Sequence, residues 1–245
     1  MIVIRKGGVL MTHLHIPDGV LPGIWIFISF ALCFVVLGLV INYVKKHKNS
    51  KKKIIHTAVI SALMLLGMSI PLGLIPYHLN LTVLAGIVLG SGLGFIAAFI
   101  VNLFLALVGH GGLTVVGLNT LIIGFEVYLA RTIFNSLSNI GLVKRVAFTT
   151  VFALLLVTVL MVGVVSTMNM PIEVAAHLEC SHHTHETISV STDHFTNNFI
   201  SFLLVVLPIV SGGIILESII ISLIVRYITK VKPDLIDYSI RYPVK

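Results

Sequence analysis

Residues 79–108 read LNLTVLAGIVLGSGLGFIAAFIVNLFLALV, an apolar run that decides how many times the chain crosses a membrane. A helix rises about 1.5 Å per residue and the hydrocarbon core of a bilayer is about 30 Å thick, so the run is too long for one crossing. Gly90-Ser91-Gly92 interrupts it near the middle, as glycines do at turns. We therefore expect a tight helical hairpin, with helices near 79–90 and 92–109.

The rest of the chain has the same apolar character. Hydrophobic residues make up 57% of the sequence, charged residues make up 10%, and the mean hydropathy is +1.09. These values predict an all-α, polytopic membrane bundle of about seven transmembrane helices. The other helices are expected near residues 21–44, 55–75, 112–134, 143–167 and 198–228.

Basic residues provide a test of this helix count. With the N-terminus outside and the C-terminus in the cytoplasm, fourteen of the sixteen lysines and arginines lie on the cytoplasmic side. This distribution follows the positive-inside rule and predicts a multi-pass protein of the cell membrane. Because the basic residues sit in short clusters beside apolar segments, they indicate membrane anchoring and argue against nucleic-acid binding.

Histidines gather on the opposite side in this topology, since nine of the eleven fall at or beyond the outer face. His13 and His15 precede the first helix, and His78 and His110 occupy tight outer turns. Imidazole is a common ligand of borderline transition metals, so we predict a metal site facing outward. A single turn histidine can instead serve as a hydrogen-bonding group at the interface, and this reading stays open for His78 and His110.

A polar loop at residues 169–198 is also rich in metal-binding side chains. One interpretation is a metal-capture loop, and the other is a solvated loop without a specific role. Thiolate and imidazole also suit zinc and copper, so the loop does not identify the ion. The ligands expected in the first interpretation are His177, Cys180, His182, His183 and His185.

Two carboxylates, Glu126 and Glu217, lie within apolar helices, where an ionisable group requires a partner or an interior position. Counting about 1.5 Å per residue from the outer helix ends places both toward the inner side, far from the outer histidines. We therefore expect structural ion pairs of Glu126 with Arg131 and of Glu217 with Arg226, or a docking surface for another subunit.

Three motifs resemble one family in order and in spacing. They are HIPDG at 15–19, HLNLT at 78–82 and ALVGHGGLTVVGLNT at 106–120. Together they resemble the CbiM/NikM family, the substrate-binding membrane subunits of energy-coupling-factor transporters for cobalt and nickel. The resemblance covers about residues 11–227 and does not account for the following segment or for the length of the histidine-rich loop.

The resemblance implies a nearly square-planar metal site. In that family a free N-terminal amine, the amide and imidazole of the first histidine, and a histidine of the second motif hold the ion. Carried over to this chain, the ligands are drawn from Met11, Thr12, His13, His15 and His78, with Asp18, His110 and Asn119 supporting them. A planar nitrogen site suits nickel and also accepts cobalt, so Co²⁺ and Ni²⁺ are alternative transported ions, and no prosthetic group is implied.

The resemblance also implies partners. They are a membrane coupling (T) subunit, a pair of ATP-binding-cassette ATPases and a small accessory membrane subunit. The chain itself has no Gly-x-x-x-x-Gly-Lys-Ser/Thr loop, so ATP hydrolysis is assigned to the partners and the chain is predicted not to be an enzyme.

Ten residues precede Met11, where the family has its N-terminus. Lys6-Gly7-Gly8-Val9 can be encoded with a GGAGGU ribosome-binding sequence a few nucleotides before the Met11 codon. We therefore expect residues 1–10 to be a non-native leader from a misassigned start. Residues 11–228 then form one transmembrane metal-binding domain, and 229–245 a cytoplasmic tail.

Starting at Met11 leaves two forms of the site. If Met11 is retained, its amine and His13 form a chelate with histidine in third place. If it is removed, the Thr12 amine and His13 form a chelate. Motif alignment instead identifies His15 as the family's first histidine, so His13 and His15 remain alternative ligands.

Two other functions were weighed. A membrane-embedded metalloenzyme needs a His-Glu-x-x-His helix or paired intramembrane acids near the metal, and the predicted depth of Glu126 and Glu217 argues against such a pair. A metal-gated channel needs a polar ring along a pore, and the apolar middle sections of the helices give no sign of one.

Overall fold

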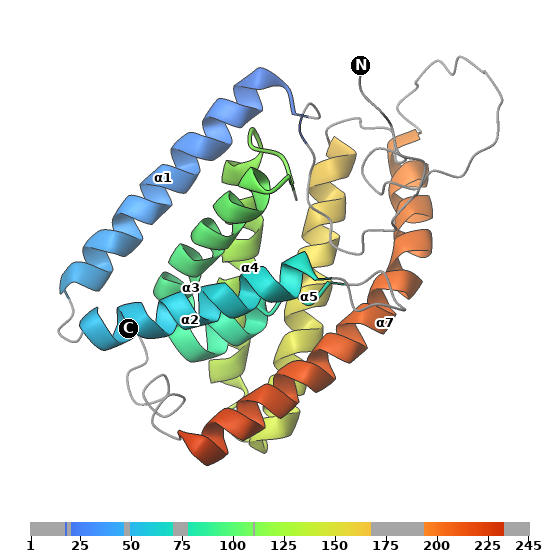
Figure 1. The fold of residues 1–245 in the computed structure, drawn as a ribbon. Coiled ribbons are helices and arrows are strands. Elements are labelled where there is room, and N and C mark those ends of the chain that lie inside the picture. Colours follow the sequence, from blue (N-terminus) through green and yellow to red (C-terminus); the bar gives the residue numbers. More distant parts are fainter. Residues whose placement is uncertain are drawn as a thin grey trace.

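The computed structural model describes residue 18 and residues 21–46, 50–70, 78–109, 111–167 and 194–232. Every regular element among them is a helix, which confirms the predicted all-α class for that part of the chain. Figure 1 shows the helices packed as one bundle. They are α1 (Gly23–Lys46), α2 (Ser50–Ser69), α3 (Thr82–Leu107), α4 (Val116–Ser136), α5 (Leu142–Thr167) and α7 (His194–Val231).

The apolar run at residues 79–108 contains α3, which is broken where its glycines predict. Gly90 has φ 81° and ψ 175°, a conformation that only glycine adopts readily. A Cβ on Gly94 would lie 3.5 Å from the carbonyl oxygen of Ala85, although nine residues of straight helix would separate them by about 13 Å. The chain therefore turns back on itself at Gly90, and the predicted break is confirmed.

The two halves of α3 differ in length. The first, Thr82 to Leu89, is about 12 Å long, and the second, Ser91 to Leu107, is about 25 Å long. The first half starts later than the predicted residue 79, because His78–Leu81 precede it in a non-helical conformation. This short half begins inside the bundle, and that position matters for the site below.

α3 and α4 form the centre of the bundle. α1 packs on both of them, α2 packs on α3, and α5 packs between α4 and α7. Figure 1 shows α2 crossing in front of α3 and α4, and α7 bending along its length. α7 contains Pro208, a residue type that removes a backbone donor and commonly bends a helix.

Apolar side chains cover much of the outside as well as the core. α1 exposes Ile24, Phe27 and Leu39, and α2 exposes Ile54 and Ile55. Exposed large apolar side chains of this kind fit a lipid environment. By length and composition alone, four helical segments among the described residues could cross a membrane, namely Gly23–Lys46, Thr82–Leu107, Val116–Ser136 and Leu142–Met161. The break at Gly90 divides the second of them.

Candidate functional site

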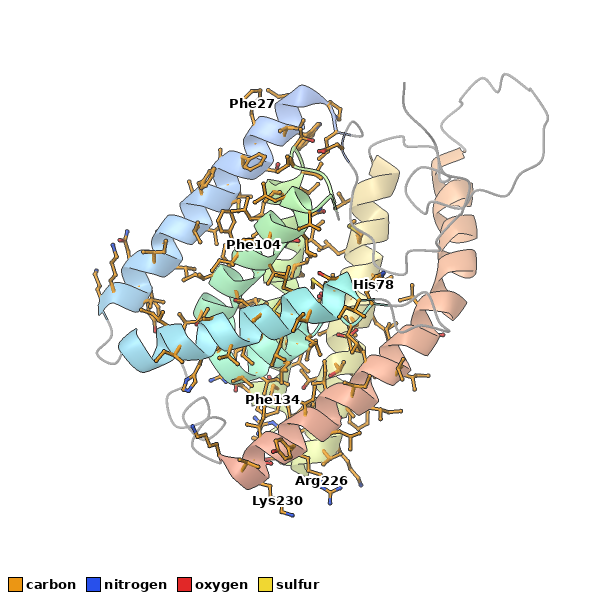
Figure 2. The ribbon with its side chains drawn as sticks, viewed as in Figure 1. Phe27, His78, Phe104, Phe134, Arg226 and Lys230 are labelled. Atoms are coloured by element: carbon orange, nitrogen blue, oxygen red, sulfur yellow. The ribbon has the colours of Figure 1, made fainter. Side chains whose placement is uncertain are left out.

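His78 lies inside the bundle. Its side chain is 5% exposed, and Figure 2 shows it beside the end of α2, between Phe27 at one end of the molecule and Lys230 at the other. His78 thus lies in a buried, non-helical connection between α2 and α3 and not in an exposed turn. The cause is the short first half of α3, which starts in the interior and draws the preceding residues in with it.

Three consecutive residues after His78 are each tied to a different helix. The Leu79 amide donates to the carbonyl of Gly67 in α2 at 3.1 Å. Asn80 Nδ2 donates to both carboxylate oxygens of Glu126 in α4, at 3.0 Å each. The Leu81 amide donates to Oε1 of Glu217 in α7, also at 3.0 Å. The segment that carries His78 is thus fixed by α2, α4 and α7 together.

The backbone of this segment is shaped for these contacts. Leu81 has φ 54° and ψ 11°, a left-handed conformation that a leucine adopts rarely and at a cost. The Thr82 hydroxyl donates to Asn80 Oδ1, and the Leu81 carbonyl accepts the Ala85 amide that begins α3. Glu217 therefore sits at the N-terminal end of a helix, where the helix dipole favours a negative charge.

The predicted separation of Glu126 and Glu217 from the histidines is wrong for His78. They are 2% and 0% exposed and converge on Asn80 and Leu81, two and three residues after His78. Arg226 is exposed at the far end of α7 (Figure 2), so the predicted Glu217–Arg226 pair is wrong. Counting along straight helices fails because His78–Leu81 descend into the bundle to meet the carboxylates.

This correction removes one argument against a metalloenzyme, since paired intramembrane acids do lie near a histidine. The side chains still do not form a complete metal site. Among the described residues, no group of three or more histidine, cysteine, aspartate or glutamate side chains is arranged to hold a metal ion. Glu126 and Glu217 instead use their oxygens on Asn80 and Leu81.

Asp18 connects the first motif to the third. Its Oδ2 accepts the Leu113 amide at 3.0 Å, and its Oδ1 accepts the Thr114 amide at 2.8 Å and the Thr114 hydroxyl at 2.5 Å. The Thr114 hydroxyl, followed by the two amides, holds the pKa of Asp18 below its ordinary value of 3.8. Asp18 is thereby attached to the turn that leads into α4.

Gly112 makes room for this attachment. A Cβ at position 112 would lie 2.6 Å from both the amide nitrogen and Cγ of Asp18, which is closer than atoms can approach. Gly112 of the third motif thus has a steric reason: a side chain at position 112 would displace Asp18.

The remaining predicted site residues divide into two groups. Asn119 is buried in the first turn of α4, where its backbone amide donates to the Val115 carbonyl at 2.9 Å. The others lie outside the described residues, and they are Met11, Thr12, His13, His15, His110, His177, Cys180, His182, His183 and His185.

Asn80 is the residue that the sequence analysis missed. It stands in the second motif, and its side-chain amide donates to both oxygens of Glu126. A useful signal was available, because backbone and carboxylate groups within a membrane must find partners inside the protein. A non-helical turn rich in donors is one place where buried acids find them.

Comparison with known proteins gives one family and two structural relatives. The family described as CbiM, cobalt uptake substrate-specific transmembrane region, matches residues 15–235. Among curated proteins, none matches the chain significantly.

The structural relatives are similar in fold. The crystal structure of a transition metal transporter has a TM-score of 0.66 and 20% identity, and the match covers 93% of this chain and 98% of that one. A truncated transition metal transporter has a TM-score of 0.56 and 19% identity, covering 88% and 98% respectively. Since the family matches nearly the whole chain, this membrane protein belongs to the CbiM family of cobalt uptake substrate-specific transmembrane regions.

Proposed function

We propose that this chain is the substrate-binding subunit of an ATP-driven uptake transporter for cobalt or nickel. It captures the ion at a nitrogen site built from the N-terminal segment and His78. The family membership supports a role in metal uptake. The observation that carries the site is the burial of His78, on a segment fixed by α2, α4 and α7.

A buried, positioned imidazole is well suited to be one ligand of a planar site. Geometry selects the ion there, because Ni²⁺ accepts a planar arrangement of nitrogens that Mg²⁺ and Ca²⁺ do not. The other ligands are a free amine at Met11 or Thr12 together with His13 or His15. One structural relative is a transition metal transporter, which is compatible with such a substrate.

The Asp18 contact supports a role for the N-terminal segment. The amides of Leu113 and Thr114 hold Asp18, which follows His15 of the first motif by three positions. A segment anchored in this way loses less conformational freedom when it closes on a metal, which favours binding. Asp18 is thus proposed to hold the base of the metal-binding arm.

For the topology we propose seven helical segments, with the N-terminus outside and the C-terminus in the cytoplasm of a cell membrane. The break at Gly90 supports counting α3 as two segments. The first of them is too short to cross the membrane alone, so the non-helical residues before it complete the path.

The partners proposed are a membrane coupling subunit, a pair of ATP-binding-cassette ATPases and a small accessory membrane subunit. Uptake of Ni²⁺ into vesicles that contain the complete set of subunits should require ATP. Ion flux through this chain alone, without ATP or partners, would favour the metal-gated channel instead.

The metal site is tested by equilibrium binding of Co²⁺ and Ni²⁺ to the chain beginning at Met11, with His13, His15 and His78 each changed to alanine. We expect His78→Ala and one of the two N-terminal changes to abolish high-affinity binding. Affinity should also fall as the pH drops, because amide and imidazole ligands must lose protons to bind. Unchanged affinity in all three variants would reject the site.

The free-amine ligand is tested separately by mass spectrometry of the mature N-terminus. A chain that begins at Met11 or Thr12 with an unmodified amine is expected. An intact, blocked Met1 would reject this part of the proposal.

A further inference from the structure

The contacts of the His78 segment raise a question that the proposed ligands do not answer, namely why two carboxylates are buried beside it. Burying a carboxylate in an apolar bundle is costly unless its oxygens accept hydrogen bonds. Glu126 and Glu217 both direct oxygens to residues that follow His78 by two and three positions. Hydrogen bonds from Asn80 and Leu81 thus offset part of the free-energy cost of burying both carboxylates.

The segment needs these acceptors. Leu81 is in a left-handed conformation and its amide lies before the first turn of α3, where no helical carbonyl accepts it. Glu217 accepts that amide, and Glu126 accepts both bonds from the Asn80 side chain. With the Leu79–Gly67 bond, three successive residues are held from three directions.

We propose that Glu126 and Glu217 are positioning residues of the metal site, which hold Asn80 and Leu81 and through them set the position of His78. This inference rests on the proposed function, in which His78 is a ligand. The two carboxylates do not touch the metal. A planar site tolerates little displacement of a ligand, so loosening the segment weakens binding and alters the coordination.

A consequence is that the position of His78 depends on the relative placement of three helices. The bonds from Asn80 and Leu81 join α4 to α7 through the segment, and the Leu79 bond joins α2 to it. A shift of α7 relative to α4 therefore moves the segment.

The test measures Ni²⁺ binding by calorimetry, using the purified protein with the N-terminus found in the cell, and records the visible d–d absorption spectrum of bound Ni²⁺. Glu217→Ala removes the acceptor and is expected to weaken binding about ten- to hundredfold, the usual effect of losing a group that orients a ligand. It should also shift the spectrum. Glu217→Gln keeps an acceptor oxygen for the Leu81 amide and should restore binding close to wild type.

Two further variants keep the test decisive. Asn80→Ala removes the link to Glu126 while leaving both backbone bonds, and should also weaken binding, so it decides the matter if Glu217→Ala does not fold. Ser218→Ala is the matched control, because it removes a bond from the adjacent residue of α7 to the Ala147 carbonyl of α5, away from the segment. Binding by this control should be unchanged.

The outcomes separate the two proposals. If His78→Ala abolishes binding while Glu217→Ala and Asn80→Ala bind Ni²⁺ like wild type with an unchanged spectrum, the positioning role is overturned and the metal site stands. If His78→Ala binds like wild type, the metal site and the positioning role fall together. Loss of binding in Ser218→Ala equal to that in Glu217→Ala would also overturn the inference, because general helix packing would explain both.

Discussion

Asp18 and Glu217 perform the same chemical task in opposite surroundings. Each carboxylate accepts a hydrogen bond at 3.0 Å from the amide of a residue far away in the sequence, Leu113 in one case and Leu81 in the other. Asp18 is exposed, whereas Glu217 is completely buried. The same bond geometry therefore has different energetic consequences.

The difference lies in what replaces the bond when it breaks. Water can hydrate both Asp18 and the Leu113 amide, so losing that contact costs little. At Glu217 the Leu81 amide has no access to water, and an unsatisfied buried donor is expensive. The buried carboxylate thus constrains the fold around His78, while the exposed one makes a contact that water can replace.

The largest effect is expected at the buried site. Glu217→Ala leaves the Leu81 amide buried without an acceptor and should lower the free energy of unfolding by about 1–3 kcal/mol. The thermal midpoint of the metal-free protein in detergent measures this loss. A midpoint equal to that of wild type would mean that water reaches the segment, and the contrast with Asp18 would disappear.

An intermediate effect is expected at Gly112, where a methyl group would displace Asp18 from all its partners at once. Gly112→Ala should lower stability by about 1 kcal/mol, because several exposed hydrogen bonds are lost together. The thermal midpoint is compared with that of Gly141→Ala, a control whose Cβ would meet nothing within 4 Å. Equal midpoints for the two variants would show that Asp18 moves aside freely.

Asp18→Asn should have a smaller effect than either change. The amide oxygen still accepts one of the bonds, and the lost charge is exposed, so we expect a decrease below about 1 kcal/mol. A decrease as large as that of Glu217→Ala would contradict the assignment of Asp18 to an exposed contact.

The smallest effect is a dependence on pH. The bonds from Thr114 and Leu113 lower the pKa of Asp18 in the folded protein. Its contribution to folding stability is therefore fully present above the ordinary pKa of 3.8. The contribution disappears as the pH falls below 3.8 and through the lowered pKa. The difference in thermal midpoint between wild type and Asp18→Asn should therefore shrink with acid. A difference in thermal midpoint that grows below pH 3.8 would contradict the lowered pKa of Asp18.

Predictability differs between these two regions. The attachment of Asp18 to the third motif joins residues in motifs that the sequence already singles out, although their contact was not predicted. The carboxylate contacts with Asn80 and Leu81 were not predicted, because a count along straight, independent helices placed Glu126 and Glu217 far from the histidines. That count ignores the descent of His78–Leu81 into the interior, which follows from the short first half of α3.

The sequence by itself determined the membrane class, the helical segments and the break at Gly90. These depend on local properties, since apolar length and the conformational freedom of glycine are read from neighbouring residues. Only the tertiary structure decided which groups meet Glu126 and Glu217, and that His78 is buried beside their partners. The physical reason is that a buried carboxylate must find a donor somewhere, but sequence does not specify which distant segment supplies it.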